Sequence, residues 1–393
     1  MTMWIIIFLV IKLITLSSIL FISQRLKRLT FDRKNSGLSR GGKFLIALLI
    51  TGGLFAITGL ILNFINAVVI IMHLAVLIII ADIFSLLFKA VTGKAIPLIY
   101  RTVTAGAVCI TVLVAGWYLD HHIWRTEYTI TTGKNIPPFK AVMFADSHIG
   151  TTFDARGFAG HLENMKQEKP DVLLIVGAFV DDDTSKEDMI NSCQALGELS
   201  SHIPGGIYFV FGNHDKGYYG SARRGFSVED LSTELQKNGI QILKDTNTVV
   251  NMHFNIFGRL DKSIERELFG TRMSPEKIAA NLDPEKYTII LDHQPTGYTD
   301  LARSGIDLVL SGHTHGGQIF PLNETGKIIG AVDAVYGHEK RNNTDFIVTS
   351  GISDWALKFK TGTKSEYVVI NIRGNDSGES SSPEKQTSDK YRP

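Results

Sequence analysis

Two hydrophobic patterns divide the chain into an N-terminal third and a larger remainder. Four continuous apolar runs lie at residues 3–23, 44–62, 67–88 and 96–118. Each run is close to the ~20 residues that a helix needs to cross the hydrocarbon core of a bilayer. None shows the period-2 alternation of a barrel strand. We therefore predict an α-helical transmembrane domain of four helices over residues 1–119.

Lysine and arginine are distributed unequally among the loops between these runs. Seven lie between residues 24 and 43, none lies in the second loop at residues 63–66, and three more lie around the third loop. Because basic loops stay in the cytoplasm, four crossings predict an integral, multi-pass membrane protein whose C-terminal domain is extracytoplasmic. The first run is expected to stay as a helix, since residues 1–4 carry no charged side chain and no cleavage pattern follows.

Two residues of opposite charge, Lys12 and Asp82, lie within the apolar runs. Charged groups inside a bilayer are costly and face a partner or a cavity. Their two helices would run in the same direction, so we expect a structural Lys12–Asp82 ion pair. A proton or ion path is the alternative, although four helices with so few ionisable groups would make a poor transporter.

From about residue 126 the pattern changes to short β-branched runs that alternate with amphipathic stretches of helical period. This alternation predicts one layered α/β domain at residues 140–372. Residues 120–139 are expected to be a connection, and the Ser-, Glu- and Lys-rich residues 373–393 a disordered tail. Strands are predicted at residues 141–145, 172–176, 207–211, 254–257, 288–291, 308–310, 346–350 and 367–372, with helices at residues 158–167, 186–199, 228–237, 275–282 and 300–303.

Charge and cysteine content limit the classes of function. The 393 residues include 40 Lys/Arg and 39 Asp/Glu. Residues 1–125 hold 12 Lys/Arg and 3 Asp/Glu, which gives them a net charge of +9. The remaining residues therefore carry a net charge of −8. An acidic C-terminal part argues against nucleic acid as a partner. Two cysteines, Cys109 and Cys193, are too few for a disulfide scaffold or a cysteine-based zinc cluster.

Five short polar clusters follow predicted strands, and they contain five of the 12 histidines. Imidazole and carboxylate together suit divalent transition metals such as Mn, Fe or Zn. The carboxyl ends of strands are also where open α/β sheets bind ligands. One such cluster is common at a surface, but five in order predict a metal site. They are Asp146-Ser147-His148, Gly177-Ala178-Phe179-Val180-Asp181, Gly212-Asn213-His214-Asp215, Asp292-His293-Gln294-Pro295 and Gly312-His313-Thr314-His315-Gly316-Gly317-Gln318.

This ordered series resembles the calcineurin-like metallophosphoesterase superfamily, whose pattern is D-x-H, G-D-x-x-D, G-N-H-[DE], a lone H and G-H-x-H. The resemblance covers residues 140–318 directly. It implies an α/β fold of the four-layer metallophosphoesterase type, a β-sandwich flanked by helices, here preceded by the four transmembrane helices. The membrane-anchored arrangement is similar to bacterial phosphohydrolases of the group that includes lipid-head-group diphosphatases.

The resemblance also implies roles for individual residues. Two divalent metal ions would be bound, the first by Asp146, His148 and His315 and the second by Asn213, His293 and His313. A hydroxide that bridges the metals would attack the phosphorus. His214, oriented by Asp215, would then protonate the leaving alkoxide as general acid. Asp181 matches the second aspartate of the pattern and is interpreted as structural.

One position departs from the family pattern. Ala178 stands where the family has the aspartate that bridges both metals, and a methyl group cannot coordinate a cation. We therefore predict that the chain binds one or both metals weakly and is inactive or strongly impaired. A natural pseudoenzyme should have lost several ligands, whereas here only one is replaced. A single engineered Asp→Ala change explains this pattern better.

The predicted function is that of a membrane-anchored, metal-dependent phosphoric ester hydrolase that cleaves a phosphoester or a pyrophosphate. The alternative is a catalytically dead protein that senses or binds a phosphorylated ligand, which Ala178 favours. Four helices exceed what a tether requires. One hypothesis is therefore a lipid-linked phosphorylated substrate with membrane lipids as partners, and the other is anchoring or oligomerisation alone.

Overall fold

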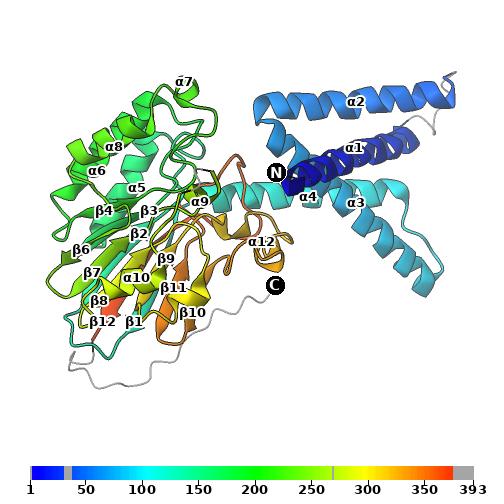
Figure 1. Cartoon of the computed structure of the whole chain (residues 1–393). Helices are drawn as coiled ribbons and strands as arrows, with labels where there is room; N and C mark the ends of the chain where they lie inside the picture. Colours follow the sequence, from blue (N-terminus) through cyan, green and yellow to red (C-terminus); the bar gives the residue numbers. More distant parts are fainter. Residues whose placement is uncertain (1, 31–37, 268–269, 375–393) are drawn as a thin grey trace.

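Four long helices precede an α/β domain of two sheets (Figure 1). The computed structural model describes residues 2–30, 38–267 and 270–374. From residue 375 on, the predicted disordered tail lies outside the described residues.

All four apolar runs form helices, and each helix is long and apolar enough to cross a membrane. The third ends at Gly93, which has a φ of +74°, and Pro97 precedes the fourth. Glycine adopts positive φ at little cost, and proline is tolerated only at the start of a helix, so this pair separates two helices that would otherwise continue. The helices are α1 (Thr2–Thr30), α2 (Arg40–Ile61), α3 (Phe64–Thr92) and α4 (Leu98–His121).

Asp82 of α3 pairs with two arginines, so the predicted Lys12–Asp82 pair is wrong. Arg25 of α1 donates two hydrogen bonds of 2.8 and 3.0 Å to the carboxylate, and Arg101 of α4 donates a third of 2.7 Å. A planar guanidinium can satisfy both carboxylate oxygens at once, which a lysine cannot do. The three residues join α1, α3 and α4 at the end of the helices away from the α/β domain.

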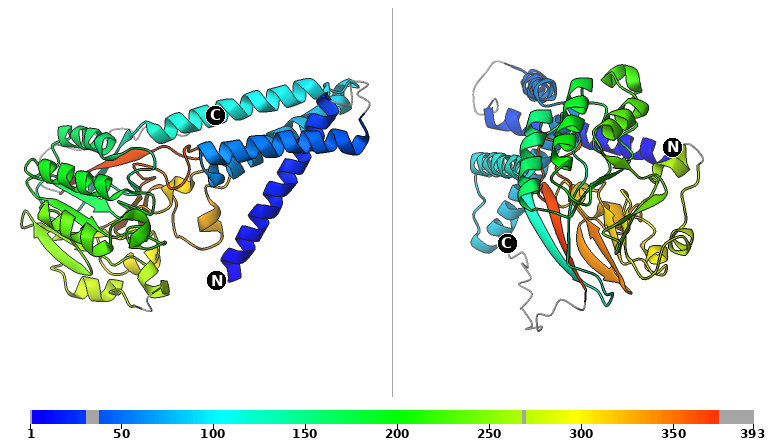
Figure 2. Two further views of the ribbon diagram at one scale, coloured as in Figure 1. Left: turned by 90° about the horizontal axis from the view of Figure 1, so that it is seen from above. Right: turned by 90° about the vertical axis from the view of Figure 1, so that its left-hand side faces the viewer.

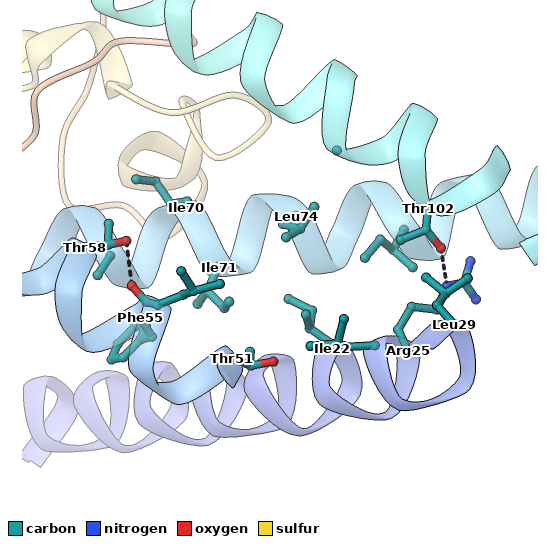
Figure 3. Close-up of a pocket in the computed structure, with 15 residues that line it drawn as sticks. Ile22, Arg25, Leu29, Thr51, Phe55, Thr58, Ile70, Ile71, Leu74 and Thr102 are labelled. Carbon is teal, nitrogen blue, oxygen red and sulfur yellow. Dashed lines mark hydrogen bonds between the residues drawn. The ribbon is translucent and has the colours of Figure 1, made fainter. Parts of the chain in front are cut away.

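A cavity of about 360 Å³ lies among the four helices (Figure 3). Its lining is mostly aliphatic, and Arg25 lies at one end, where its Nε donates to Thr102 Oγ1 at 2.7 Å. An ion path needs polar groups along its length. This lining therefore argues against the ion-path alternative.

The α/β domain contains two mixed sheets of six strands each. The strand orders are β1-β12-β2-β3-β4-β5 and β10-β11-β9-β8-β7-β6. The strands are β1 (Trp124–Thr131), β2 (Phe139–Phe144), β3 (Val172–Val176), β4 (Ile207–Val210), β5 (Gln241–Ile242), β6 (Thr246–Val250), β7 (Phe254–Gly258), β8 (Tyr287–Leu291), β9 (Leu308–Ser311), β10 (Gly337–Arg341), β11 (Thr344–Val348) and β12 (Glu366–Arg373).

Apolar side chains pack between the two sheets and on the outer face of each. Met143 and Leu174 of the first sheet share the central core with Ile289 of the second. Helices α5, α6 and α8 cover the outer face of the first sheet, and α10 and α11 cover that of the second (Figure 2). This order of helix, sheet, sheet and helix confirms the predicted four-layer fold. The short and long helices are α5 (Ala155–Gln167), α6 (Lys186–Ser200), α7 (Ser221–Arg224), α8 (Val228–Lys237), α9 (Ser263–Glu267), α10 (Pro275–Ala280), α11 (Tyr298–Leu301), η1 (His315–Gly317) and α12 (Thr325–Ile328).

Residues 120–139 are not only a connection, because β1 lies within them. β1 begins three residues after α4 ends at His121 and pairs in parallel with β12 along its whole length. Its side chains alternate between partly buried and exposed positions, as expected for a strand at the edge of a sheet. The fourth membrane helix therefore leads almost directly into the first sheet.

Candidate metal centre

The five polar clusters meet at one edge of the two sheets. They follow β2, β3, β4, β8 and β9. β2, β3 and β4 are parallel to one another, and so are β8 and β9. Because the carboxyl ends of parallel strands point the same way, side chains up to 169 positions apart, from Asp146 to His315, come together.

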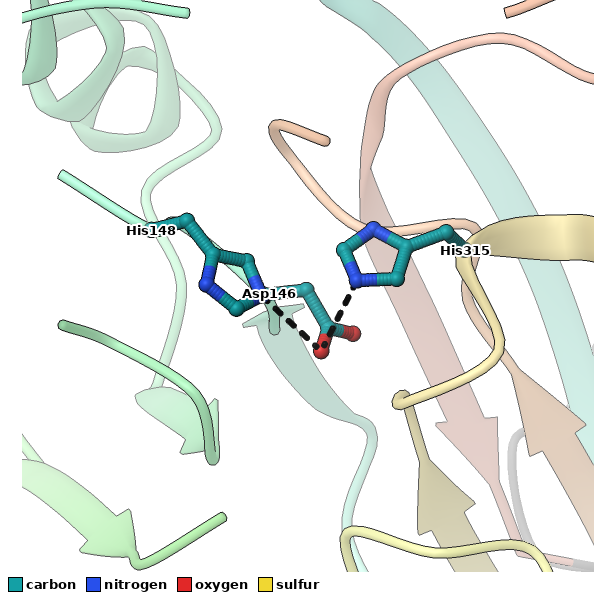
Figure 4. A group of neighbouring side chains, drawn as sticks. All are labelled: Asp146, His148 and His315. Atoms are coloured by element: carbon teal, nitrogen blue, oxygen red, sulfur yellow. Dashed lines mark ion pairs between the residues drawn. The ribbon is translucent and has the colours of Figure 1, made fainter. Parts of the chain in front are cut away.

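Asp146 lies at the centre of the cluster (Figure 4). Its Oδ1 is 3.9 Å from His148 Nε2, 3.8 Å from His315 Nε2 and 3.9 Å from His293 Nε2. Its other oxygen, Oδ2, accepts a 2.8 Å hydrogen bond from the backbone N–H of His313. One carboxylate therefore contacts both predicted groups of ligands.

Asp146, His148 and His315 form a set that could hold a cation. One ligand atom from each lies within 4.8 Å of the other two, and all three residues are buried. Among the described residues, Asp146 Oδ1 and His148 Nε2 have no hydrogen-bond partner. Buried polar atoms without partners are costly and rare. A carboxylate and two imidazoles that converge in this way fit a divalent transition metal.

The other ring nitrogen of each imidazole is held in place. His148 Nδ1 lies 3.0 Å from Asp181 Oδ2, which agrees with the structural role expected of Asp181. His315 Nδ1 lies 3.3 Å from the backbone oxygen of Ser353 and 3.3 Å from Asp354 Oδ1. Such contacts fix the tautomer and orientation of a metal-binding histidine. Asp354 was not predicted from the sequence, because it lies six residues after the end of β11 and belongs to none of the five clusters.

Asn213, His293 and His313 converge beside the first set. His293 Nδ1 donates to the backbone oxygen of Val176 at 2.8 Å, so a neutral ring has its lone pair on Nε2. His293 Nε2, which carries that lone pair, lies 3.1 Å from Asn213 Oδ1, and His313 Nδ1 lies 3.0 Å from the same oxygen. Two acceptor atoms that face each other are stable only with a proton or a cation between them. This group therefore also fits a cation.

Glycines let the loops approach this closely. A Cβ on Gly177 would lie 2.6 Å from His293 Nδ1, and one on Gly312 would lie 2.4 Å from Asp146 Oδ2. The site also holds non-glycine residues at positive φ, among them His313 at +72° and Asp146 at +55°. Such conformations cost free energy and cluster at functional sites.

Burial and charge set the protonation states of the imidazoles. Burial opposes a charge on His148, but the Asp181 hydrogen bond and the nearby carboxylates outweigh it, so the pKa of His148 is raised. Burial and then the charge on His148 hold the pKa of His315 well below its ordinary value. Burial raises the pKa of the Asp146 carboxyl. A neutral His315 keeps a free lone pair on Nε2, as a metal ligand requires.

Ala178 lies between the two groups of ligands. Its backbone oxygen accepts from the His148 N–H at 3.2 Å, on the side of the first group. On the side of the second group, a Cβ on Gly212 would lie 2.4 Å from the Ala178 nitrogen and 2.7 Å from His293 Nε2. The backbone of Ala178 therefore contacts the loops that carry both groups.

Asp215 does not support His214 as predicted. Its oxygens accept four backbone N–H groups at 2.7 to 3.1 Å, those of Ala178, Phe179, Val180 and Gly212. Among the described residues, His214 Nδ1 has no hydrogen-bond partner. The His214 ring lies instead beside the rings of His148, Tyr218 and Trp355, with distances between ring centroids of 4.9, 5.2 and 5.2 Å. Asp215 therefore fixes the loop that carries Ala178.

Comparison with known proteins agrees with this geometry. Residues 139–317 match the family described as calcineurin-like phosphoesterase. An uncharacterised metallophosphoesterase of Campylobacter jejuni is 30% identical over 238 residues, which cover 60% of this chain and 59% of that protein. A transmembrane protein with a metallophosphoesterase domain from Bos taurus is 30% identical over 256 residues, 61% of this chain and 54% of that protein. This chain thus spans less than two thirds of either relative.

Two further proteins resemble the chain. An uncharacterised metallophosphoesterase of Aquifex aeolicus is 28% identical over 271 residues, which cover 67% of this chain and 98% of that protein. A crystal structure of a Thermus thermophilus protein covers 56% of this chain and 90% of its own, with 11% identity and a TM-score of 0.35.

The role found for Asp215 can be tested through stability. An Asp215→Asn substitution leaves an amide in place of the carboxylate that accepts four N–H groups. We expect the free energy of unfolding of the metal-free chain to fall by about 1–3 kcal/mol, the usual cost of unsatisfied buried donors. His214→Asn is the matched control and should change it little. Chemical unfolding followed by circular dichroism provides the measurement, and equal stability of the two variants would contradict the assignment.

Proposed function

We propose that this chain, which carries a calcineurin-like metallophosphoesterase domain at residues 139–317, is a membrane-anchored and metal-dependent phosphoric ester hydrolase. The observation that carries the proposal is the convergence of buried imidazoles on Asp146, whose Oδ1 lacks a hydrogen-bond partner among the described residues. A second observation is that four helices could cross a membrane. A relative from Bos taurus is also named a transmembrane protein.

The residues around the proposed centre would form two cation sites. Asp146, His148 and His315 would hold one divalent cation, and Asn213, His293 and His313 a second. Cations bound there would neutralise the phosphoryl oxygens and provide an activated water as nucleophile. The protein's own contribution is to hold six ligands rigidly at one edge of two sheets, which fixes the phosphorus relative to the attacking group.

His214 remains the candidate for the general acid because of its position next to His148 and Trp355. Burial, followed by the charge on His148, lowers the pKa of His214 to about 2. A neutral imidazole can still donate one hydrogen bond to a phosphoryl oxygen or to a leaving group. Proton transfer from His214 would require the negative charge of a bound substrate to favour the protonated ring.

We further propose that Ala178 impairs this chemistry. The supporting observation is that residue 178 is buried between the two groups of ligands and offers a methyl group there. Without a bridging carboxylate, the mutual repulsion of two cations is not offset. Retention of the other ligands agrees with an engineered change, which stays a prediction. A protein that binds a phosphorylated ligand without cleaving it is the second candidate function.

The catalytic domain is proposed to be extracytoplasmic. The support comes from the basic loop between α1 and α2 and from the position of the uncharged turn between α2 and α3. In that turn, Asn63 and Asn66 donate to the backbone oxygen of Ala356, so it lies on the side of the catalytic domain.

This orientation can be tested with Met252, whose side chain is 79% exposed. A Met252→Cys chain in intact cells should react with a membrane-impermeant maleimide, since Cys109 and Cys193 are buried. The unsubstituted chain is the control. Labelling only after the cells are lysed would contradict the orientation.

The Ala178→Asp substitution tests the function. Aspartate tolerates the positive φ of +52° at this position, as does asparagine, so Ala178→Asn is the matched control without charge. We expect Ala178→Asp to raise Mn-dependent hydrolysis of a phosphomonoester or phosphodiester by at least ~10-fold, the size of effect seen when groups that support a metal are changed. The control should stay at the level of the unsubstituted chain.

Two outcomes of this assay would count against the proposal. No gain for Ala178→Asp despite bound Mn would contradict a hydrolase and favour the binding protein. No bound Mn in any variant would contradict both.

A phosphorylated lipid and a soluble phosphoester should be compared in mixed micelles with the full-length Ala178→Asp chain. Faster turnover of the lipid would support the lipid-linked substrate, and equal rates would leave the helices as an anchor.

A further inference from the structure

Four exposed apolar side chains lie close to the proposed site, on the segment that follows η1. Phe320, Leu322, Ile328 and Ile329 are 66, 59, 80 and 58% exposed. Between residues 319 and 332 the only charged residues are Glu324 and Lys327. These four side chains are called here the 320–329 patch. Clusters of exposed apolar residues mark surfaces that contact another molecule.

Backbone contacts connect this patch with the membrane helix α4. Lys360 N–H donates to the backbone oxygen of Gly116 in α4 at 3.0 Å, and a Cβ on Gly116 would lie 2.8 Å from the Lys360 oxygen. The next residues bind the start of the patch, because Thr361 N–H donates to the Gln318 oxygen at 2.9 Å and Phe320 N–H donates to Thr361 Oγ1 at 3.1 Å. Only one segment therefore separates the patch from α4.

The contact with α4 lies close to the end of a candidate membrane span. Gly116 is five residues before the end of the candidate span Leu98–His121, so it is ~7.5 Å from that end along the helix. The next two residues, Trp117 and Tyr118, are 53 and 51% exposed. Exposed aromatic side chains at the end of a membrane helix mark the boundary between lipid and water.

The views of the whole molecule agree with this placement. Helix α12, which carries Ile328, lies on the side of the α/β domain that faces the membrane helices (Figures 1 and 2). At the depth of the lipid head groups, four apolar side chains would be stabilised by contact with the acyl chains, whereas they are costly in water.

We infer that the 320–329 patch inserts into the surface of the same bilayer that α1–α4 cross. Its partner is the lipid surface, and this contact attaches the α/β domain to the bilayer in addition to the four helices. The patch follows His315 and Gln318 directly, and Gln318 Nε2 donates to the backbone oxygen of Trp355 at 3.3 Å, next to His214. Insertion of the patch would therefore hold these residues of the site near the level of the head groups. This inference does not depend on whether the site is catalytic.

The test places a fluorescent probe on the patch. Ile328→Cys in the full chain is labelled with an environment-sensitive maleimide, and the chain is inserted at one copy per lipid nanodisc. The lipids carry a nitroxide quencher on the acyl chain. Met252→Cys is the matched control, because Met252 is 79% exposed and precedes β7 at the end of the strand opposite the site. Both native cysteines are buried.

We expect a blue shift and strong loss of emission for the probe at residue 328, and neither change for the probe at residue 252. Emission at residue 328 that matches residue 252 would overturn the inference. A blue shift that grows with the number of copies per disc, with no loss of emission from the acyl-chain quencher, would indicate a second copy of the chain as the partner and would overturn it as well.

Discussion

The carboxylate of Asp146 is the interaction on which the rest of the site depends. It is 1% exposed, its Oδ1 lies within 4 Å of three imidazole nitrogens, and its Oδ2 is bound by the backbone of a fourth histidine. An isolated buried charge of this kind would be strongly unfavourable. The cluster makes physical sense as a set of ligands for cations, because cations would compensate both the carboxylate and the imidazole lone pairs.

The loop at residues 353–366 connects this centre with the membrane helices. The segment from Ser353 to Glu366 contacts His315 through Ser353 and Asp354, and contacts α4 through Lys360 and Ser365. The turn between α2 and α3 binds the same segment through Asn63 and Asn66. The position of the site relative to the bilayer is thus set by backbone hydrogen bonds and close packing, not by a flexible tether.

Patterns that repeat along the chain allowed most of the fold, and the polar clusters that converge at one edge of the sheets, to be predicted. The four apolar runs and the eight predicted strands all correspond to observed elements, because burial imposes their periodicity directly. Strand β1 was missed, since an edge strand is half polar, and so were the short β5 and the largely polar β6 and β10.

Interactions between distant residues could not be predicted in the same way. The partners of Asp82 depend on how α1, α3 and α4 rotate about their axes, which the apolar runs do not specify. Asp215 follows His214 in the sequence, but its carboxylate points to the backbone of the neighbouring loop. Asp354 contacts His315 across 39 positions of sequence, with no spacing motif to signal it.

The central claim, that these side chains form a metal centre, is tested most directly by anomalous diffraction from crystals of the chain grown with Mn²⁺. The account predicts an anomalous peak bound by Asp146, His148 and His315 at about 2.0–2.2 Å from each ligand atom. A second peak near Asn213 and His293 should be weaker than the first, because Ala178 supplies no ligand. A structure that contains Mn elsewhere, with no peak beside Asp146, would contradict the account.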